Sequence, residues 1–248
     1  MQLAQGAVVR ILVVNVNTTE SMTDAIAASA RAVASPGTEI VGLTPTFGAD
    51  SCEGNVESYL AAIGVLDRVL KYPEPFDAVI QAGFGEHGRE GLQEALDVPV
   101  VDITEAAAIM AGLLGHKFGV VTTLDRTVPL IEDRLLLAGL DRRCAAVVAS
   151  GLSVLELEQD HERTVAAIVA KAKEIVANHG VEVICLGCGG MAGLDEAVAA
   201  ATGAPVVDGV ASAVTLAESL VRMKLSTSKV RTYAPARAKR LSGWPLRS

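Results

Sequence analysis

The stretch EVICLGCGGMAG (182–193) places a cysteine between a short apolar segment and a glycine-rich turn. The apolar residues before Cys188 predict a buried strand, and the glycines after it predict a tight turn that leads into a helix. At such a strand end, unpaired backbone N–H groups and the dipole of a following helix lower the pKa of a thiol. We therefore expect Cys188 to lie in a cleft as a reactive thiolate.

The chain repeats itself at a distance of about a hundred residues. Three pairs of segments align at offsets of 105, 106 and 107 residues: DAVIQAG (77–83) with EVICLGC (182–188), VPVVD (98–102) with APVVD (204–208), and ILVVN (11–15) with GVVTT (119–123) when Val14 is set on Val121. Three agreeing offsets in the same order indicate a duplication. In the first of these alignments Gly83 stands opposite Cys188, so only one copy carries the sulfur.

Short segments rich in Val and Ile alternate with longer amphipathic ones. The predicted strands are 11–15, 39–43, 77–82, 98–101, 118–122, 145–149, 182–187 and 204–207. The predicted helices include 20–34, 53–71, 127–138, 156–178 and 209–224. Strand–helix alternation favours parallel sheets covered on both faces. The expected fold class is α/β, with two similar Rossmann-like lobes, mainly parallel sheets, and a pseudo-twofold relation that puts the active site in the cleft between the lobes.

The duplication also predicts where the lobes divide. We expect residues 1–112 to form the first lobe and residues 113–208 the second, with residues 209–248 returning to complete the first lobe. Ligands of open α/β sheets bind beyond the carboxyl ends of the strands. The segments expected to converge there are Asn15–Asn17, Gly83–Gly85, Thr122–Thr123 and Cys188–Gly190.

Composition narrows the functional class. The net charge of −8 argues against a general nucleic-acid binder, which must neutralise phosphates. The apolar run at 106–115 is too short for a membrane span and predicts a buried helix. The N-terminus lacks the pattern of a signal peptide, and four cysteines do not suggest a disulfide scaffold. We expect a cytoplasmic protein that binds neither nucleic acid nor membranes, with its basic C-terminal segment 226–248 either solvated or in a subunit contact.

The other cysteines and the glycine motif carry weaker signals. Cys185 and Cys188 have C-x-x-C spacing, but Cys185 aligns with Ile80 in the other copy, so it is interpreted as a buried strand residue. No two further clustered ligands complete a zinc site, and no metal is expected. Cys52 and Cys144 have no partner pattern and are interpreted as bystanders. GFGEHG (83–88) lacks the spacing of a dinucleotide motif, so no cofactor is expected.

NVNTT (15–19) follows the first strand and precedes a helix. Asn17 can therefore cap that helix or bind a ligand. Thr122 and Thr123 occupy the matching place in the second copy, which favours a shared binding role. His87 is a candidate acid or base beside Gly83, although a lone loop histidine is more often solvated.

Together NVNTT, GFGEHG, VVTT, LGCGGM, PVVDGVASAV and the late TSK (227–229) resemble the hydantoin racemases and the related allantoin racemases, from about residue 10 to 240. The resemblance implies a homo-oligomeric isomerase that acts on a 5-substituted hydantoin without metal or cofactor. In that family two cysteines, one per lobe, flank the substrate. Cys188 matches the second cysteine, and Gly83 stands where the first usually is.

Two thiols suit this chemistry because racemisation removes the ring-carbon proton from one face and returns it to the other. The expected site residues are Cys188 and the Gly83 position for catalysis, with Asn17, Phe84, Gly85, Thr122, Thr123, Gly189 and Gly190 around the substrate. Backbone N–H groups of the two glycine turns are expected to stabilise the charge that develops on the neighbouring carbonyl oxygen.

The glycine at position 83 leaves several hypotheses open. In the first hypothesis the chain is an inactivated variant. In the second it uses another second base, such as His87 or water, and in the third it performs another task. A single-cysteine decarboxylase of the arylmalonate type, which resembles this arrangement in having glycine at the first position, is one alternative. A two-lobed small-molecule binding protein without chemistry is another, but it gives no reason for a cysteine in a glycine turn.

Overall fold

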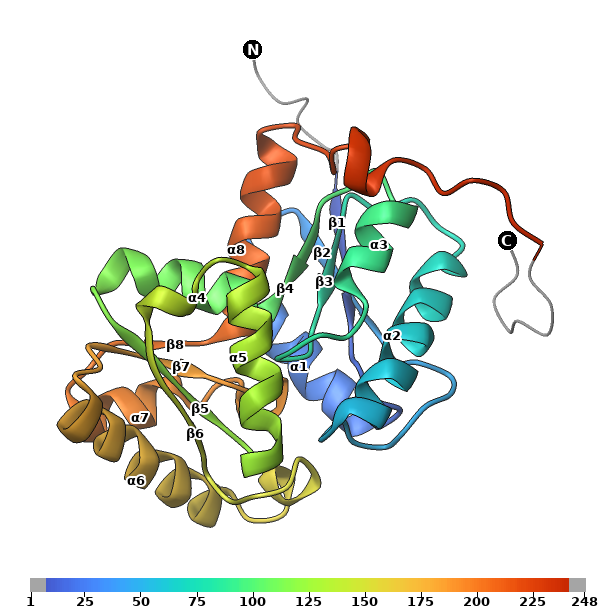
Figure 1. Ribbon diagram of the computed structural model, residues 1–248. Helices are drawn as coiled ribbons and strands as arrows, with labels where there is room; N and C mark the ends of the chain where they lie inside the picture. The colour runs from blue at the N-terminus through green and yellow to red at the C-terminus, as the bar shows by residue number, and fades with distance from the viewer. Residues whose placement is uncertain (1–7, 241–248) are drawn as a thin grey trace.

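The computed structural model describes residues 8–240, which form two α/β lobes (Figure 1). The strands are β1 (Val9–Val14), β2 (Thr38–Leu43), β3 (Ala78–Gln81) and β4 (Val100–Asp102) in the first lobe, and β5 (Phe118–Thr122), β6 (Cys144–Ala149), β7 (Val183–Leu186) and β8 (Val206–Val207) in the second. All pairings are parallel, and the order β2-β1-β3-β4 is repeated as β6-β5-β7-β8. The predicted α/β class and the duplication are confirmed.

The helices are α1 (Glu20–Val33), α2 (Asn55–Leu70), α3 (Arg89–Ala95), α4 (Ile103–Leu114), α5 (Val128–Leu137), α6 (His161–His179), α7 (Asp195–Thr202) and α8 (Gly209–Arg222). Most begin and end close to the predicted bounds. The exception is α6, predicted to begin at 156. A separate 3₁₀ turn forms at Leu155–Glu158, and the Asp160 side chain then caps α6 by accepting from the backbone N–H of Arg163.

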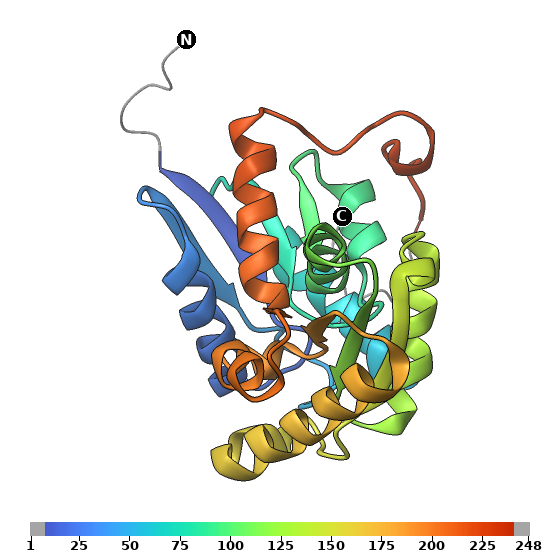
Figure 2. The same cartoon turned by 90° about the vertical axis from the view of Figure 1, so that its left-hand side faces the viewer.

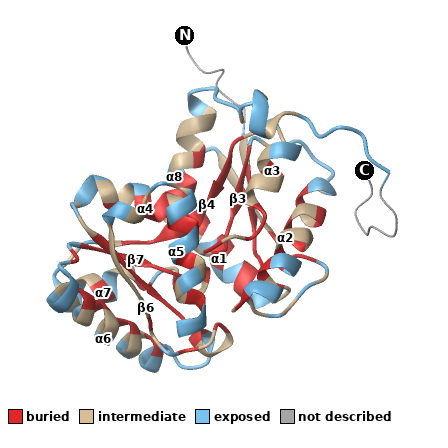
Figure 3. Cartoon of the chain, in the orientation of Figure 1, coloured by how far each residue is buried: buried red, intermediate tan, exposed pale blue. Residues whose placement is uncertain are grey.

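The inner strands β3, β5 and β7 are buried on both faces, whereas the edge strands β2 and β6 are mostly half-buried (Figure 3). Because successive strand residues point to opposite faces, Ile11 and Val13 of β1 pack in the core beneath α1 and α8, while Leu12 and Val14 pack in the core beneath α2. The second sheet divides its side chains in the same way between two cores. Covering helices on both faces leave the carboxyl ends of the strands free to build a site.

The two lobes exchange one helix each. Helix α4 follows β4 of the first sheet but lies against β5 and β7 of the second, whereas α8 follows β8 and lies against β3 and β4 of the first (Figure 2). Ala107, Ala108 and Ala111 of α4 pack in a core of the second lobe, and Ala106 packs in a core of the first. Their N-terminal ends meet closely, since a Cβ on Gly209 would lie 2.7 Å from the Ile103 carbonyl oxygen. We propose the division into 1–112 with 209–248 and 113–208, with this reciprocal helix pair holding the lobes together.

The segment after α8 returns along the first lobe. Thr227 donates from its backbone N–H to the Asp97 carbonyl, and the ammonium of Lys229 donates to the carbonyls of Gln93 and Glu94 at the end of α3. The TSK motif therefore caps α3 and anchors this segment. The rest of the predicted tail, residues 241–248, lies outside the described residues. Within residues 8–240, no helix combines the length and apolarity needed to span a bilayer.

Candidate active site

A small cleft lies where the carboxyl ends of β1, β3, β5 and β7 meet. Most of the predicted site residues line it: Asn17, Gly83, Phe84, Thr122, Thr123, Cys188, Gly189 and Gly190. Cys52, His87, Val16 and Met22 also line it. Of the predicted set, Gly85 alone is not among the lining residues.

Cys188 lies two residues after the end of β7, separated from it by Gly187, and has an extended backbone. The next residues form a 3₁₀ turn, Gly189–Met191, rather than the start of the predicted helix, which begins only at Asp195. This turn lies against the first lobe, because a Cβ on Gly189 would stand 3.0 Å from the Ala82 carbonyl oxygen. The loop that carries Cys188 thus meets the loop that carries Gly83.

The pKa of Cys188 differs from the prediction. Burial raises it from its ordinary value of 9.0 to about 11, and a hydrogen bond from the Gly190 backbone lowers it by less. The predicted lowering of this pKa is therefore wrong. A three-residue 3₁₀ turn carries little of the dipole that a full helix would supply, so desolvation dominates. At neutral pH Cys188 is predominantly a thiol.

Gly83 does not leave an open slot opposite Cys188. A Cβ at this position would overlap the His87 imidazole at Cδ2, stand 2.5 Å from Val16 Cγ1, and stand 2.7 Å from Gln81 Nε2. The Gln81 amide is fixed there because it donates to the Gly83 carbonyl oxygen. Neighbouring side chains have filled the space that a side chain at position 83 would need.

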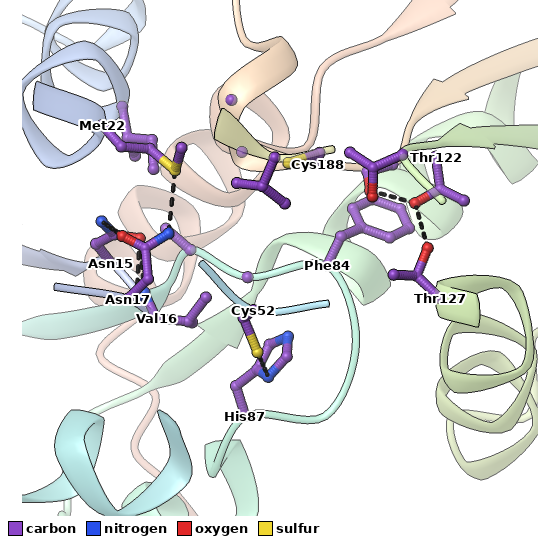
Figure 4. Close-up of a pocket in the computed structure, with 18 residues that line it drawn as sticks. Asn15, Val16, Asn17, Met22, Cys52, Phe84, His87, Thr122, Thr127 and Cys188 are labelled. Carbon is purple, nitrogen blue, oxygen red and sulfur yellow. Dashed lines mark hydrogen bonds between the residues drawn. The ribbon is translucent and has the colours of Figure 1, made fainter. Parts of the chain in front are cut away.

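His87 and Cys52 form a contact that the sequence pattern does not predict. The His87 ring is 5% exposed, and its Nδ1 lies 3.6 Å from Cys52 Sγ (Figure 4). Burial lowers the pKa of His87 from 6.5 to about 4, so the ring is neutral at pH 7. Burial also raises the pKa of Cys52 to about 11. The interpretation of Cys52 as a bystander is wrong, because the loop before α2 folds into the cleft and brings Cys52 to its wall.

The polar groups of the cleft are held to different degrees. The Asn17 amide oxygen accepts from Asn15 Nδ2 and the Thr19 N–H, while its amide nitrogen faces the sulfur of Met22 at 3.1 Å. A thioether is a weak acceptor, so this N–H group is free to turn to a ligand. The hydroxyl of Thr122 instead donates 3.1 Å to the Gly187 carbonyl, which ties it to the loop before Cys188.

Phe84 and Gly85 share a turn but differ in role. Phe84 packs between cores of both lobes and presents an apolar wall to the cleft (Figure 4). Gly85 has a φ of 133°, which only glycine adopts readily, and its N–H donates 2.9 Å to Thr104 Oγ1. The predicted use of this N–H for substrate is not supported, because Thr104 already accepts from it.

Known proteins similar to this chain identify its family. The sequence model of the Asp/Glu/hydantoin racemase family matches residues 11–217. The chain belongs to this family. A hydantoin racemase of Rhizobium meliloti is 37% identical over 94% of this chain and 97% of its own length.

Solved structures agree with this assignment. An allantoin racemase from Pseudomonas fluorescens is 70% identical with a TM-score of 0.93, covering 94% of this racemase and 100% of that chain. An allantoin racemase from Klebsiella pneumoniae is 39% identical with a TM-score of 0.91, and the match covers 95% of this chain and 96% of that chain. Unliganded arylmalonate decarboxylase shares the fold at 16% identity and a TM-score of 0.57, covering 86% of this chain and 92% of that chain. The protein is an isomerase of the racemase type that acts on a small molecule.

A buried ion-pair network supports one side of the racemase cleft. The Arg134 side chain from α5 is 1% exposed and lies between four carboxylates of the first lobe and α4: Glu86, Glu90, Asp102 and Glu105, at 2.6–3.1 Å. Asp102 also caps α4 by accepting from the N–H groups of Thr104 and Glu105. Glu86 immediately precedes His87, so this network holds the turn that carries the imidazole.

Proposed function

We propose that this enzyme racemises a 5-substituted hydantoin without metal or cofactor, and that allantoin is the first substrate to test. The 70% identity to an allantoin racemase over the whole of that chain supports this substrate class. Allantoin is itself a hydantoin with a ureido group on the ring carbon C5. The observation that carries the mechanism is the position of Cys188 at the carboxyl end of β7, inside a cleft shared by both lobes.

In the proposed reaction, Cys188 transfers a proton to or from C5 on one face of the ring. The electron pair released from the C5–H bond moves onto the C4 carbonyl oxygen, which gains negative charge. The Asn17 amide N–H and the Thr123 hydroxyl line the same cleft and are the proposed donors to that oxygen. One such donor lowers the barrier by about 2.7–4 kcal/mol in other oxyanion sites.

The substrate has an apolar boundary on part of the cleft in this proposal. Phe84, Val16 and Met22 line the cleft beside the polar groups. The flat face of the substrate would lie against these side chains, while the ring carbonyls and the polar ureido group face the hydrogen-bonding groups. The glycines at 189 and 190 allow the ring to approach the backbone beside Cys188. We further propose that the enzyme is a cytoplasmic homo-oligomer.

The test follows the C5 proton of each allantoin enantiomer in heavy water, alongside the optical rotation. The wild-type enzyme is expected to exchange C5–H and to lose optical rotation from either enantiomer. Cys188→Ala should abolish racemisation while circular dichroism stays unchanged, and Cys144→Ala, at the remote start of β6, should leave it intact. Decarboxylation of an arylmalonate by an enzyme that leaves all hydantoins unchanged would favour the decarboxylase alternative. An active Cys188→Ala variant would exclude Cys188 as the acid–base group.

A further inference from the structure

We propose that Cys52 is the second catalytic thiol of this racemase, replacing the absent cysteine at position 83, and that His87 positions it. The inference rests on the proposed racemisation of hydantoins, which needs an acid–base group on each face of C5. Cys52 reaches the same cleft as Cys188 from a different loop, the one between β2 and α2. In Figure 4 Cys188 lies on one side of the pocket, and the Cys52–His87 pair lies on another.

The glycine at position 83 is what allows this arrangement. The His87 ring occupies the volume that a side chain at position 83 would take. From there its Nδ1 faces Cys52 Sγ at 3.6 Å, and Ser58 Oγ lies 3.7 Å from the same sulfur. A cysteine at position 83 and the observed place of His87 exclude each other. The observed Cys52–His87 contact therefore depends on the glycine at position 83.

The electrostatics of the pair suit a thiol that must exchange its proton. His87 is buried and neutral at pH 7, so one ring nitrogen is an acceptor. With Nδ1 as that acceptor, the ring orients the S–H bond of Cys52. Cys188 also contributes to raising the pKa of Cys52, as expected for two sulfurs facing one small site. A negative charge on one sulfur opposes a second charge on the other, so once one thiol ionises its neighbour remains a thiol.

The reaction starts from the state in which one sulfur is a thiolate and the other is a thiol. A Cys188 thiolate takes the C5 proton and becomes a thiol, and the C–H electron pair moves to the C4 oxygen. The S–H of Cys52 then turns from His87 Nδ1 to the opposite face of C5 and gives its proton there, the electron pair returns to form the new C–H bond, and Cys52 is left as thiolate. The other enantiomer reacts in the reverse direction, starting from the Cys52 thiolate. No oxidant, reductant or metal takes part.

The experiment compares Cys52→Ala and Cys52→Ser with the wild type, and uses Cys144→Ala as the matched control. Each variant is incubated in heavy water with the separate allantoin enantiomers, and both C5 deuteration and inversion are measured. We expect Cys52→Ala to lower racemisation about 100-fold or more, the lower end of the general acid–base effect. It should still deuterate, with retention, the enantiomer whose C5–H faces Cys188. Cys188→Ala should show the complementary preference.

The role of His87 has its own readout. His87→Asn keeps a polar atom near the position of Nδ1, whereas His87→Leu does not. The His87→Asn variant is expected to retain more racemisation activity than the His87→Leu variant. Only His87→Leu should change the pH dependence of deuteration by Cys52. Equal thermal stability of the two variants would separate positioning from a structural role.

The outcomes distinguish this inference from the proposed function. A wild type that racemises allantoin while Cys52→Ala and Cys52→Ser do so at the same rate overturns the role of Cys52 and leaves the function standing. A wild type that racemises no hydantoin overturns the function and the inference with it. Selective loss of inversion, with one-sided deuteration remaining in Cys52→Ala, supports both.

Discussion

The His87 imidazole lies where the Cβ of a side chain at Gly83 would be. Position 83 is therefore a filled part of the cleft wall rather than a gap opposite Cys188. The ring is held there by burial and by its contact with Cys52. Any attempt to restore a cysteine at position 83 must also move this ring.

Gly83→Cys is expected to destabilise the enzyme when introduced alone. The new side chain overlaps His87 and crowds Val16 and Gln81, and overpacking of a filled core costs about 1–3 kcal/mol. Gly83→Cys combined with His87→Ala should recover part of that loss because the ring is removed. Thermal unfolding of the two variants and the parent measures the difference.

Activity of the same variants tests the second thiol. The double variant carries a thiol at position 83, so it should racemise allantoin even when Cys52→Ala is added. The control is His87→Ala with Cys52→Ala and glycine kept at 83, which should not racemise. Equal stability of Gly83→Cys and the parent would show that neighbouring side chains do not fill the space beside position 83.

The fold could be predicted from sequence because its signals are repeated. Two copies of a buried parallel strand pattern, each ending in polar or glycine residues, predict both sheets and the edge where they face each other. The convergence of Asn17, Thr123 and Cys188 on one cleft follows from those strand ends. The topology of the backbone places these residues, and the hydrophobic periodicity of the sequence predicts that topology.

The Cys52–His87 contact could not be predicted in the same way. It joins two irregular segments, and the loop of Cys52 has no counterpart pattern in the second copy. The pKa of Cys188 was predicted in the wrong direction because a strand end followed by glycines does not reveal whether a full helix or a short 3₁₀ turn comes next. The balance between desolvation and the few N–H groups there depends on packing that sequence patterns do not report.

Arg134→Met should strongly destabilise the racemase. Arg134 is the buried partner of Asp102 and of three further carboxylates, and removing one partner of a buried ion pair costs about 3–5 kcal/mol. The control is Arg163→Met, because Arg163 is 60% exposed in its pair with Glu156 and such pairs contribute about 0–1 kcal/mol. Urea unfolding of both variants provides the comparison. Similar losses for the two would show that burial of Arg134 does not matter.

Gly189→Ala should reduce activity more than Gly190→Ala. The added methyl group on Gly189 would stand 3.0 Å from the Ala82 carbonyl and 3.1 Å from Ile26 Cδ1, so it forces apart the loops that carry Cys188 and Gly83. On Gly190 the nearest atom is Leu157 Cδ1 at 3.3 Å, on a side chain that can shift. Steady-state kcat/KM for allantoin, with circular dichroism to check folding, measures the effect. Equal activities would show that the approach of the two loops is not needed.

The rate of racemisation should rise with pH well beyond neutrality. Burial raises the pKa of Cys188 and of Cys52 to about 11, and the proposed reaction needs one of the two as thiolate. Since the thiolate fraction grows about tenfold per pH unit below the pKa, log kcat/KM should rise with a slope near one from about pH 7 to pH 10.

Stability should change in the opposite direction over part of this range. A thiol whose pKa is higher in the folded than in the unfolded chain binds more protons when folded, so the free energy of unfolding falls as pH rises from about 9 towards 11. Cys188→Ala removes one such thiol and should flatten this decline. Activity profiles and urea unfolding at matched pH values test both slopes together. A kcat/KM profile that is already flat below about pH 8 would mean that a group other than these buried thiols supplies the base.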